Sequence, residues 1–585
     1  MYTIIEVAKK IFTFFLPYNG MSDFINNINL VRKNWVPSEA WEIELLKNQQ
    51  KDKILREKYP PNQQERIYAQ QYGKTVVNCI DKLDQYSINK SADAMIAIGT
   101  LFSLPTILSP IIGGTGGYLV SKLSKNLKNQ KKLTSFNGAM IGAGLYFIFS
   151  EYLRAQLEKI TTRIARFQAR NNDLRDYSNF VIHNQEQEQQ IGANRLNTIN
   201  HENQFAKDVK LSKTYKDAFK TLDEMKKDYK EYNQWKKKFK LNEIKNRKNI
   251  EKTFFSEEEL SKAQKDRNRI INSIHKLELA SNNEEINFQY AIDMIIYAAK
   301  MCGVALATLF TFAIPKTSTK KTVPTNFEKT LKFGVPIVIP IFSLLVSAFL
   351  VKYQKDSAKL GRYEIKKEML SDENSFITYD DKKRNEVQTD FKKHARTNVI
   401  KKIINDIKSI KTMPKRLNEM YSASSIQNIN STNTKKLNIS EKQKQEAELL
   451  QKQLFYAFEK IDEKSEGFSD DIDALMHSIK ITIGTAVNIG FNIYSLNLLT
   501  KKLKNYNENK IPGFFEGIKL MKYLNRKDLM AIFIIPYTVK ATLGFIIDTI
   551  SARSRKKANK IGIMTAIKDL EDERVFTKKY LQNVI

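Results

Sequence analysis

The chain has 585 residues, of which 96 are Lys or Arg and 64 are Asp or Glu, so its formal net charge at pH 7 is +32. The two cysteines, Cys79 and Cys302, cannot form a disulfide framework, and five scattered histidines leave little for a metal site. The charge is unevenly spread, because nearly charge-free windows of about 20 residues alternate with long stretches of Lys, Asn, Gln and Glu. This pattern excludes collagen-like and simple coiled-coil chains and disfavours an ordinary soluble domain.

The chain begins with an amphipathic stretch, MYTIIEVAKKIFTFFLP, which predicts an interfacial anchor helix. Six apolar windows follow, each long enough to cross a hydrocarbon layer, which takes about 20 helical residues. The windows are Asp93–Leu123, Phe136–Leu153, Phe288–Ile314, Phe333–Val351, Ile479–Leu499 and Leu529–Ile550. They form three pairs, each joined by a short basic segment, and long polar stretches separate the pairs. The sequence therefore predicts an all-α integral membrane protein whose six transmembrane helices form three hairpins.

A motif recurs after the second window of each pair, at intervals of about 200 residues. Each copy begins with a basic stretch and closes with the pattern Leu-x-Asp-x-x-x-Phe. The closing residues are Leu174, Asp176 and Phe180, then Leu370, Asp372 and Phe376, then Leu570, Asp572 and Phe576. We interpret this as a threefold internal repeat, in which each hairpin is followed by an amphipathic helix at the membrane surface.

The repeat divides the chain into six regions, with long helical extramembrane segments between the copies. The regions are an N-terminal anchor and helical region 1–92, repeat 1 at 93–182, a helical segment 183–287, repeat 2 at 288–378, a helical segment 379–477 and repeat 3 at 478–585. A polar linker, 422–434, interrupts the fifth region and cannot bury a core. Ser256-x-x-Glu259 and Ser440-x-x-Gln443 are capping boxes, which predict that helices begin after Ser256 and Ser440.

Charged residues inside the apolar windows are the candidate functional residues, because a charge in hydrocarbon is costly and needs a reason. They are Asp293, Lys300 and Lys540. If Lys540 belonged to a transport path, it would line a water-accessible cavity and meet an acid there. In a structural protein it would instead reach nearby protein or lipid oxygens, and no continuous cavity would run through the helices. We expect the second arrangement.

Two further residue sets have predicted structural roles. Gly113 with Gly117 and Gly138 with Gly142 have the GxxxG spacing that lets helix backbones approach closely. The basic residues near the helix ends are candidates for binding an anionic, cardiolipin-like phospholipid. They are Arg163, Arg166, Lys359, Arg362, Lys557 and Lys560.

No catalytic triad, nucleotide fingerprint, metal-ligand spacing or nucleic-acid module occurs in the sequence, so we expect no enzyme activity, no cofactor of its own, no nucleic-acid partner and no small-molecule substrate. The Lys-, Asn- and Ile-rich composition is typical of A/T-rich protist genomes. The sequence therefore favours a non-catalytic accessory subunit of a large mitochondrial inner-membrane complex, such as a protist respiratory-chain assembly or supercomplex, that bridges subunits and binds anionic lipid. The alternative is a six-helix channel or transporter with threefold pseudosymmetry.

Overall fold

The computed structural model describes residues 20–123, 131–183, 211–313, 335–389, 439–502 and 534–584, except positions 173, 184–186, 373 and 380, together with residue 187 and most of 412–420. Helices make up 90% of this part of the chain. The prediction of an all-helical protein is therefore confirmed. The predicted anchor at the start of the chain and the linker 422–434 lie outside the described residues.

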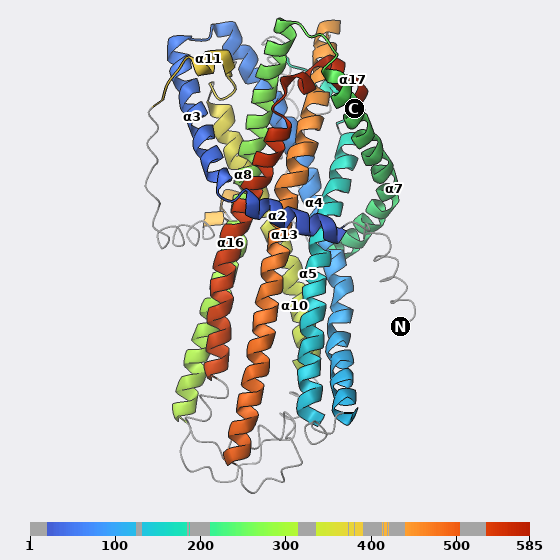
Figure 1. Ribbon diagram of the computed structural model, residues 1–585, viewed down its shortest axis with the longest axis vertical. Coiled ribbons are helices and arrows are strands. Elements are labelled where there is room, and N and C mark those ends of the chain that lie inside the picture. The colour runs from blue at the N-terminus through green and yellow to red at the C-terminus, as the bar shows by residue number, and fades with distance from the viewer. Residues whose placement is uncertain are drawn as a thin grey trace, which may run out of the picture.

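Six long helices run side by side along the molecule (Figure 1). They are α4 (Gln63–Leu123), α5 (Lys131–Asn172), α8 (Glu257–Ala313), α10 (Val335–Ser371), α13 (Glu441–Lys502) and α16 (Ile535–Asp569). The main contacts join α4 with α5, α8 with α10, and α13 with α16, and each of these pairs also packs on the others. The three pairs correspond to the three pairs of apolar windows.

Among the described residues, no helix has a stretch long and apolar enough to cross a membrane. The prediction of six transmembrane helices is therefore wrong, and so is the predicted location in the mitochondrial inner membrane. The apolar windows are parts of much longer helices, and polar and charged side chains interrupt them, including Lys480, Asn488 and Asp548. The predicted surface helices are also wrong as separate elements, because α5, α10 and α16 continue without a break into the segments that begin near Lys159, Lys355 and Lys557.

Further helices surround one half of the bundle. Helix α2 (Gly20–Lys33) crosses the long helices near mid-height, α3 (Pro37–Lys58) and α11 (Asp381–Asn385) lie on one side, and α7 (Leu211–Ile250) and α17 (Lys578–Val584) lie on the other (Figure 1). We call this the packed half. It comprises these helices, residues 63–98, 153–172, 257–294, 351–371, 441–476 and 551–569 of the long helices, and the described residues within 174–183, 372–389, 412–420 and 570–577. The remaining parts of the long helices form the distal half.

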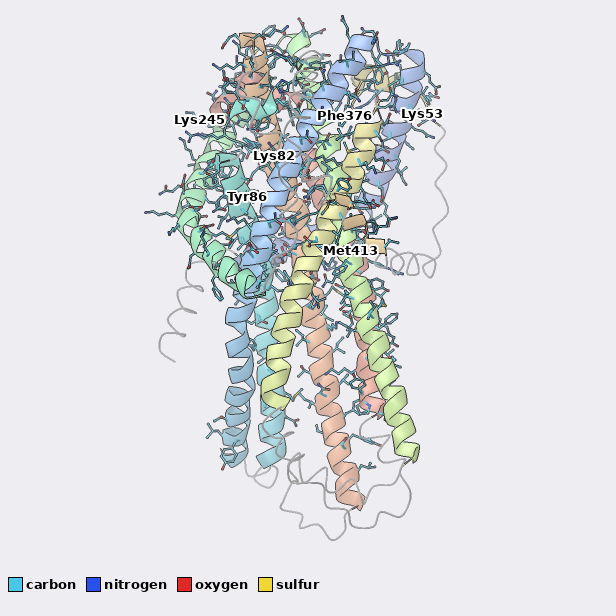
Figure 2. All side chains as sticks on the ribbon, turned by 180° about the vertical axis from the view of Figure 1, so that it is seen from behind. Lys53, Lys82, Tyr86, Lys245, Phe376 and Met413 are labelled. Atoms are coloured by element: carbon cyan, nitrogen blue, oxygen red, sulfur yellow. The ribbon has the colours of Figure 1, made fainter. Side chains whose placement is uncertain are left out.

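The hydrophobic core of the described residues lies in the packed half. Its largest cluster brings together Tyr72 and Ile80 from α4, Ile274 from α8, Tyr456 from α13 and Leu581 from α17, all at most 2% exposed. Figure 2 shows Phe376, Lys82 and Tyr86 on this half of the molecule. Since the cluster draws on segments far apart in sequence, the packed half folds as one unit.

The closing motif of each repeat copy adopts a similar turn at the end of α5, α10 and α16. Asp176, Asp372 and Asp572 each accept a hydrogen bond from the backbone N–H two residues later, at 2.9, 3.0 and 3.1 Å. The motif's phenylalanines are almost fully buried in the same cluster: they are Phe180, Phe376 and Phe576. The shared motif therefore anchors the end of each second helix in the core.

Candidate functional site

A cavity of about 210 Å³ lies in the distal half, between α8, α13 and α16. Its walls are mostly apolar, and four charged side chains reach it: Asp293 from α8, Lys480 from α13, and Lys540 and Asp548 from α16. We call it the α8–α13–α16 pocket. A mostly apolar concavity with a few convergent polar groups is the usual form of a binding site.

Two of these charged side chains neutralise each other. The Lys480 ammonium lies 2.6 and 2.7 Å from the two carboxylate oxygens of Asp548. The lysine stems also cover two small residues, because the Cε of Lys480 faces Gly544 and the Cε of Lys540 faces Gly484. The glycines thus make room for long lysine side chains to lie across the facing helix.

Asp293 differs from the other acid of the pocket because it makes no hydrogen bond or ion pair with another residue that the structure describes. Burial, followed by the repulsion of Asp548, raises the pKa of Asp293 to about 6, and Lys480 opposes this shift only in part. A half-buried carboxylate without a basic partner is the group in this pocket that an incoming cation would neutralise.

Aromatic side chains form part of the pocket wall beside these charges. The rings of Tyr297 and Phe545 pack 4.8 Å apart between α8 and α16, and Tyr537 lines the same cavity. A cation that approaches Asp293 would therefore also meet aromatic faces, which attract positive charge. Among the described residues that line the pocket, none is a nucleophile paired with a general base.

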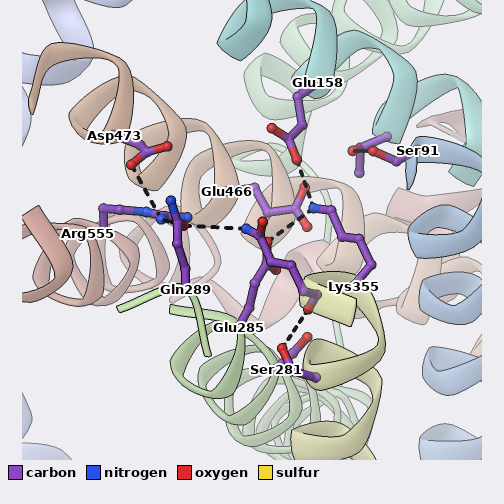
Figure 3. Close-up of polar contacts among 12 residues, drawn as sticks. Ser91, Glu158, Ser281, Glu285, Gln289, Lys355, Glu466, Asp473 and Arg555 are labelled. Atoms are coloured by element: carbon purple, nitrogen blue, oxygen red, sulfur yellow. Dashed lines mark hydrogen bonds and ion pairs between the residues drawn. The ribbon is translucent and has the colours of Figure 1, made fainter. Parts of the chain in front are cut away.

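A network of buried ion pairs lies beyond the pocket, in the packed half (Figure 3). Lys159 of α5 pairs with Asp471 of α13, and Lys355 of α10 lies 2.8 Å from Glu158 of α5. Arg555 of α16 bonds to Gln289 of α8. The second helix of each pair thus supplies one cation to a different pair, in a closed cycle that ties the three pairs together.

A second set of buried charges lies further into the packed half. Arg166 pairs with Asp462 and lies 3.0 Å from Glu466, whereas Arg362 lies 3.0 Å from Asp84 and 3.8 Å from Glu278. One carboxylate oxygen from each of Glu278, Asp462 and Glu466 could approach a common metal ion. Because the two guanidinium groups already neutralise these acids, we assign the cluster to ion pairing and not to metal binding.

The predicted lipid-binding residues are placed against acids of the same chain. Arg163 lies 3.8 Å from Glu463, and Lys359 lies 3.0 Å from Asp356. The remaining pairs join Lys557 to Glu39 and Lys560 to Glu42, both at 2.6 Å. Arg166 and Arg362 are buried as described above. All six cations therefore have an intramolecular anion.

The four predicted helix-packing glycines come together where α4 meets α5. A Cβ on Gly113 would overlap the Gly138 carbonyl oxygen and lie 2.9 Å from the Gly142 Cα. A Cβ on Gly138 would equally overlap the Gly113 carbonyl oxygen and lie 2.9 Å from the Gly117 Cα. Any side chain here would separate the two helices.

The sequence singled out two residues of the pocket and missed two. Asp293 and Lys540 line it together, whereas the side chain of Lys300 lies outside the described residues. Lys480 and Asp548 were not singled out, because each lies near the end of an apolar window, where a charge looks ordinary. Both residues nevertheless lie inside apolar windows, and a search for every charge within these windows would have identified them. Lys540 lines this cavity together with Asp293 and Asp548, and our expectation that it reaches nearby protein or lipid oxygens stays a prediction.

Known protein families, curated proteins and solved structures were all compared with the chain, and none of them matches it. The geometry described above is therefore the basis for the functional argument.

Proposed function

We propose that this chain is a non-catalytic structural subunit of a larger assembly, in which partner polypeptides cover the distal half. The observation that carries the proposal is the distribution of exposed apolar side chains. On the six long helices, all the large hydrophobic residues recorded as exposed among the described residues lie in the distal half. They are Tyr118, Leu119, Ile141, Leu145, Phe149, Ile295, Ile296, Ile479, Ile493, Tyr494, Ile535, Tyr537, Val539, Ile546 and Ile550.

Exposed apolar surface of this extent supports an interaction role, because isolated soluble proteins rarely expose large continuous apolar patches. The exposed residues lie on α4, α5, α8, α13 and α16, so they surround the bundle and are not restricted to one face. A second copy related by a twofold axis would cover one face only. The distribution therefore favours several contacts with other polypeptides.

The pocket indicates what one partner would carry. Ile296 and Tyr537 line it and are exposed, and Asp293 lines it without a hydrogen-bonded or ion-paired base among the described residues. A helix with an apolar face and a Lys or Arg at its centre would bury these side chains and neutralise Asp293. We expect this contact to be a hot spot of the interface.

The test is site-specific photo-crosslinking of the full chain in its native cells. A photoreactive residue replaces Ile296 beside the pocket or, as a matched control, Leu241 on α7, which is 68% exposed but belongs to the packed half. We expect one cross-linked polypeptide of defined mass from position 296, present at a fixed ratio to the chain in the assembly isolated by native electrophoresis, and none from position 241.

Asp293→Asn should reduce the yield of the cross-link at position 296 by about tenfold, because an unpaired cationic side chain of the partner would then be buried. Three results would overturn the proposal. They are cross-linking only to lipid, cross-linking only to a second copy of the chain, and a chain that migrates alone at its own mass in the native gel.

A further inference from the structure

A second cavity, of about 620 Å³, lies in the packed half between the end of α5, α7 and α13. It is more polar than the α8–α13–α16 pocket and is separate from it. Its charged lining residues are Arg170, Arg175, Asp228, Glu231 and Lys452, and aromatic and amide side chains complete the wall. We call it the α5–α7–α13 cavity.

Arg170 is held between two aromatic rings at the wall of this cavity. The centre of its guanidinium lies 4.1 Å from the ring centroid of Trp235 and 5.5 Å from that of Phe455. Burial lowers the pKa of Arg170 to about 10, so the group remains charged at neutral pH. Aromatic contacts fix the plane of a guanidinium and leave its N–H edge as the part that bonds to a ligand.

The edge of Arg170 has no acceptor among the residues that the structure describes, and this sets it apart from its neighbours on α5. One turn earlier Arg166 pairs with Asp462, and Arg163 pairs with Glu463. The side chains of Arg175 and Lys452, which also line the cavity, likewise have no hydrogen-bond or ion-pair partner among the described residues, although the Arg175 backbone carbonyl accepts from the Gln451 amide. Three cationic side chains without a hydrogen-bonded anion among the described residues therefore line one polar cavity, and Glu459 acts on Arg170 only through its charge.

Two acids also line the cavity, and they further restrict the kinds of ligand that it could bind. Asp228 accepts a hydrogen bond from the Gln168 amide, and Glu231 lies beside it on α7. Carboxylates repel an anion but accept hydrogen bonds from hydroxyl groups. The side-chain amides of Asn171 and Asn172 add both donors and acceptors at the end of α5. The cavity thus combines cationic groups that suit an anion with carboxylates and amides that suit hydroxyl groups.

We infer that the α5–α7–α13 cavity binds a hydroxylated phosphomonoester. Arg170 donates its N–H edge to two phosphate oxygens, Arg175 and Lys452 balance the remaining charge, and Asp228 and Glu231 accept hydrogen bonds from the hydroxyl groups. A bidentate arginine–phosphate pair is both strong and directional. The phosphate could belong to a free sugar phosphate or to the head group of a phosphoinositide, since both offer the same chemistry.

The test uses the full chain and the fluorescence of Trp235, whose ring lies against Arg170. The chain has three tryptophans, and Trp35→Phe with Trp41→Phe leaves Trp235 as the single reporter. The probes are inorganic phosphate, a free hexose phosphate, the unphosphorylated hexose, and neutral vesicles with or without a phosphoinositide. We expect a saturable change with hexose phosphate, at least about tenfold weaker binding of inorganic phosphate, and no change with the hexose alone.

Three variants connect the signal to the site. Arg170→Lys keeps the charge but loses the planar fork, so binding should weaken by about tenfold or more. Asn172→Asp adds an anion at the cavity without altering the aromatic contacts, and it should also weaken binding even if Arg170 variants fold poorly. Lys245→Gln removes an exposed cation elsewhere on α7 and should leave binding unchanged.

Loss of binding in both cavity variants, with Lys245→Gln unaffected, would support the inference. If the free hexose phosphate gives no signal but phosphoinositide vesicles give one that needs Arg170, the same chemistry is supported and the ligand is a lipid head group. Binding that is equal in all variants, or no saturable binding by any phosphate probe, would overturn it.

Discussion

Asp293 shows how a single side chain links the candidate binding pocket to the stability of the chain. Its carboxylate faces an apolar-walled cavity beside Asp548, and its pKa is raised from an ordinary value near 4 to about 6. The folded state therefore holds a proton that the unfolded chain has already released between these two pH values. Stability must fall as pH rises through this window and stay lower above it.

Asp293→Asn removes this penalty. We expect the free energies of unfolding of variant and parent to be similar near pH 4, with the variant more stable above pH 7. Two pKa units correspond to about 3 kcal/mol, which we reduce to about 1 kcal/mol because the group is half-exposed. Denaturant unfolding at pH 4.5 and pH 8 measures the difference. A gain of equal size at both pH values would contradict the explanation, and Asp548→Asn, which breaks the pair with Lys480, should destabilise the chain.

A glycine gives a second prediction at this scale. At Gly562 of α16, an added Cβ would overlap the backbone carbonyl of Lys464 and lie 2.7 Å from the Cα of Ser465, so α16 and α13 are in backbone contact there. Gly562→Ala should therefore cost about 1–3 kcal/mol, because backbone cannot move aside like a flexible side chain. Gly467→Ala is the matched control, since nothing lies within 4 Å of that Cβ. It should be neutral or stabilising by up to about 1 kcal/mol, as expected for Ala in a helix. Thermal unfolding of the two variants measures the difference in stability. A similar loss of stability in both variants would refute this account of the contact.

At the scale of elements, buried ion pairs hold the three helix pairs together. Arg362 of α10 is 2% exposed and reaches Asp84 of α4 and Glu278 of α8, while burial raises the pKa of both acids. The guanidinium opposes this rise. Without it the two carboxyls would be buried with less compensation, and their pKa values would rise further.

Arg362→Met should destabilise the chain by about 3–5 kcal/mol at pH 8, the usual cost of removing one partner from a buried pair. The loss should be smaller at pH 5, because protonated carboxyls no longer need a cation. Lys557→Met provides the comparison: its pair with Glu39 lies near the surface and should contribute less than about 1 kcal/mol. A loss that does not depend on pH would show that packing, and not charge, is what Arg362 supplies.

The sequence predicted where these helices begin and lie along the chain better than it predicted what surrounds them in the folded protein. The capping boxes form as predicted: the Ser256 and Ser440 hydroxyls accept from the backbone N–H of Glu259 and Gln443 at 3.2 and 3.3 Å. Apolar periodicity also located the six long helices. It could not tell a membrane-spanning segment from a long helix that is apolar over part of its length. Nor could it find the cavity around Asp293, since Lys480 and Asp548 approach this residue only after three helices have packed.

The whole molecule consists of two halves with different roles. The residues that make up the five hydrophobic clusters lie in the packed half, from Val31 on α2 to Val584 on α17. The exposed apolar residues of the long helices lie in the distal half. The first half therefore contains the described hydrophobic core, and the proposed role of the second is to offer its apolar surface to partners.

This division predicts that the packed half is stable without the distal half. In a shortened chain, residues 102–148, 298–347 and 484–546 are each replaced by a short Gly- and Asn-containing loop, which preserves the buried ion pairs and the five hydrophobic clusters of the packed half. We expect a single cooperative unfolding transition, because the segments removed contribute none of the cluster residues. We also expect the shortened chain to remain monodisperse at concentrations where the full chain, purified alone, self-associates through its exposed apolar side chains.

Circular dichroism during heating measures whether unfolding is cooperative. Light scattering after gel filtration measures whether the shortened chain is monodisperse. A shortened chain in which α7 is also removed is the control. It loses Leu222, Met225 and Tyr232, which pack in the core against α4 and α5, and it should unfold at a markedly lower temperature. If the first shortened chain showed no cooperative transition while the full chain did, the distal half would be part of the folding unit. The apolar side chains of the distal half would then contribute to the stability of the chain itself, and they would no longer be evidence for a partner.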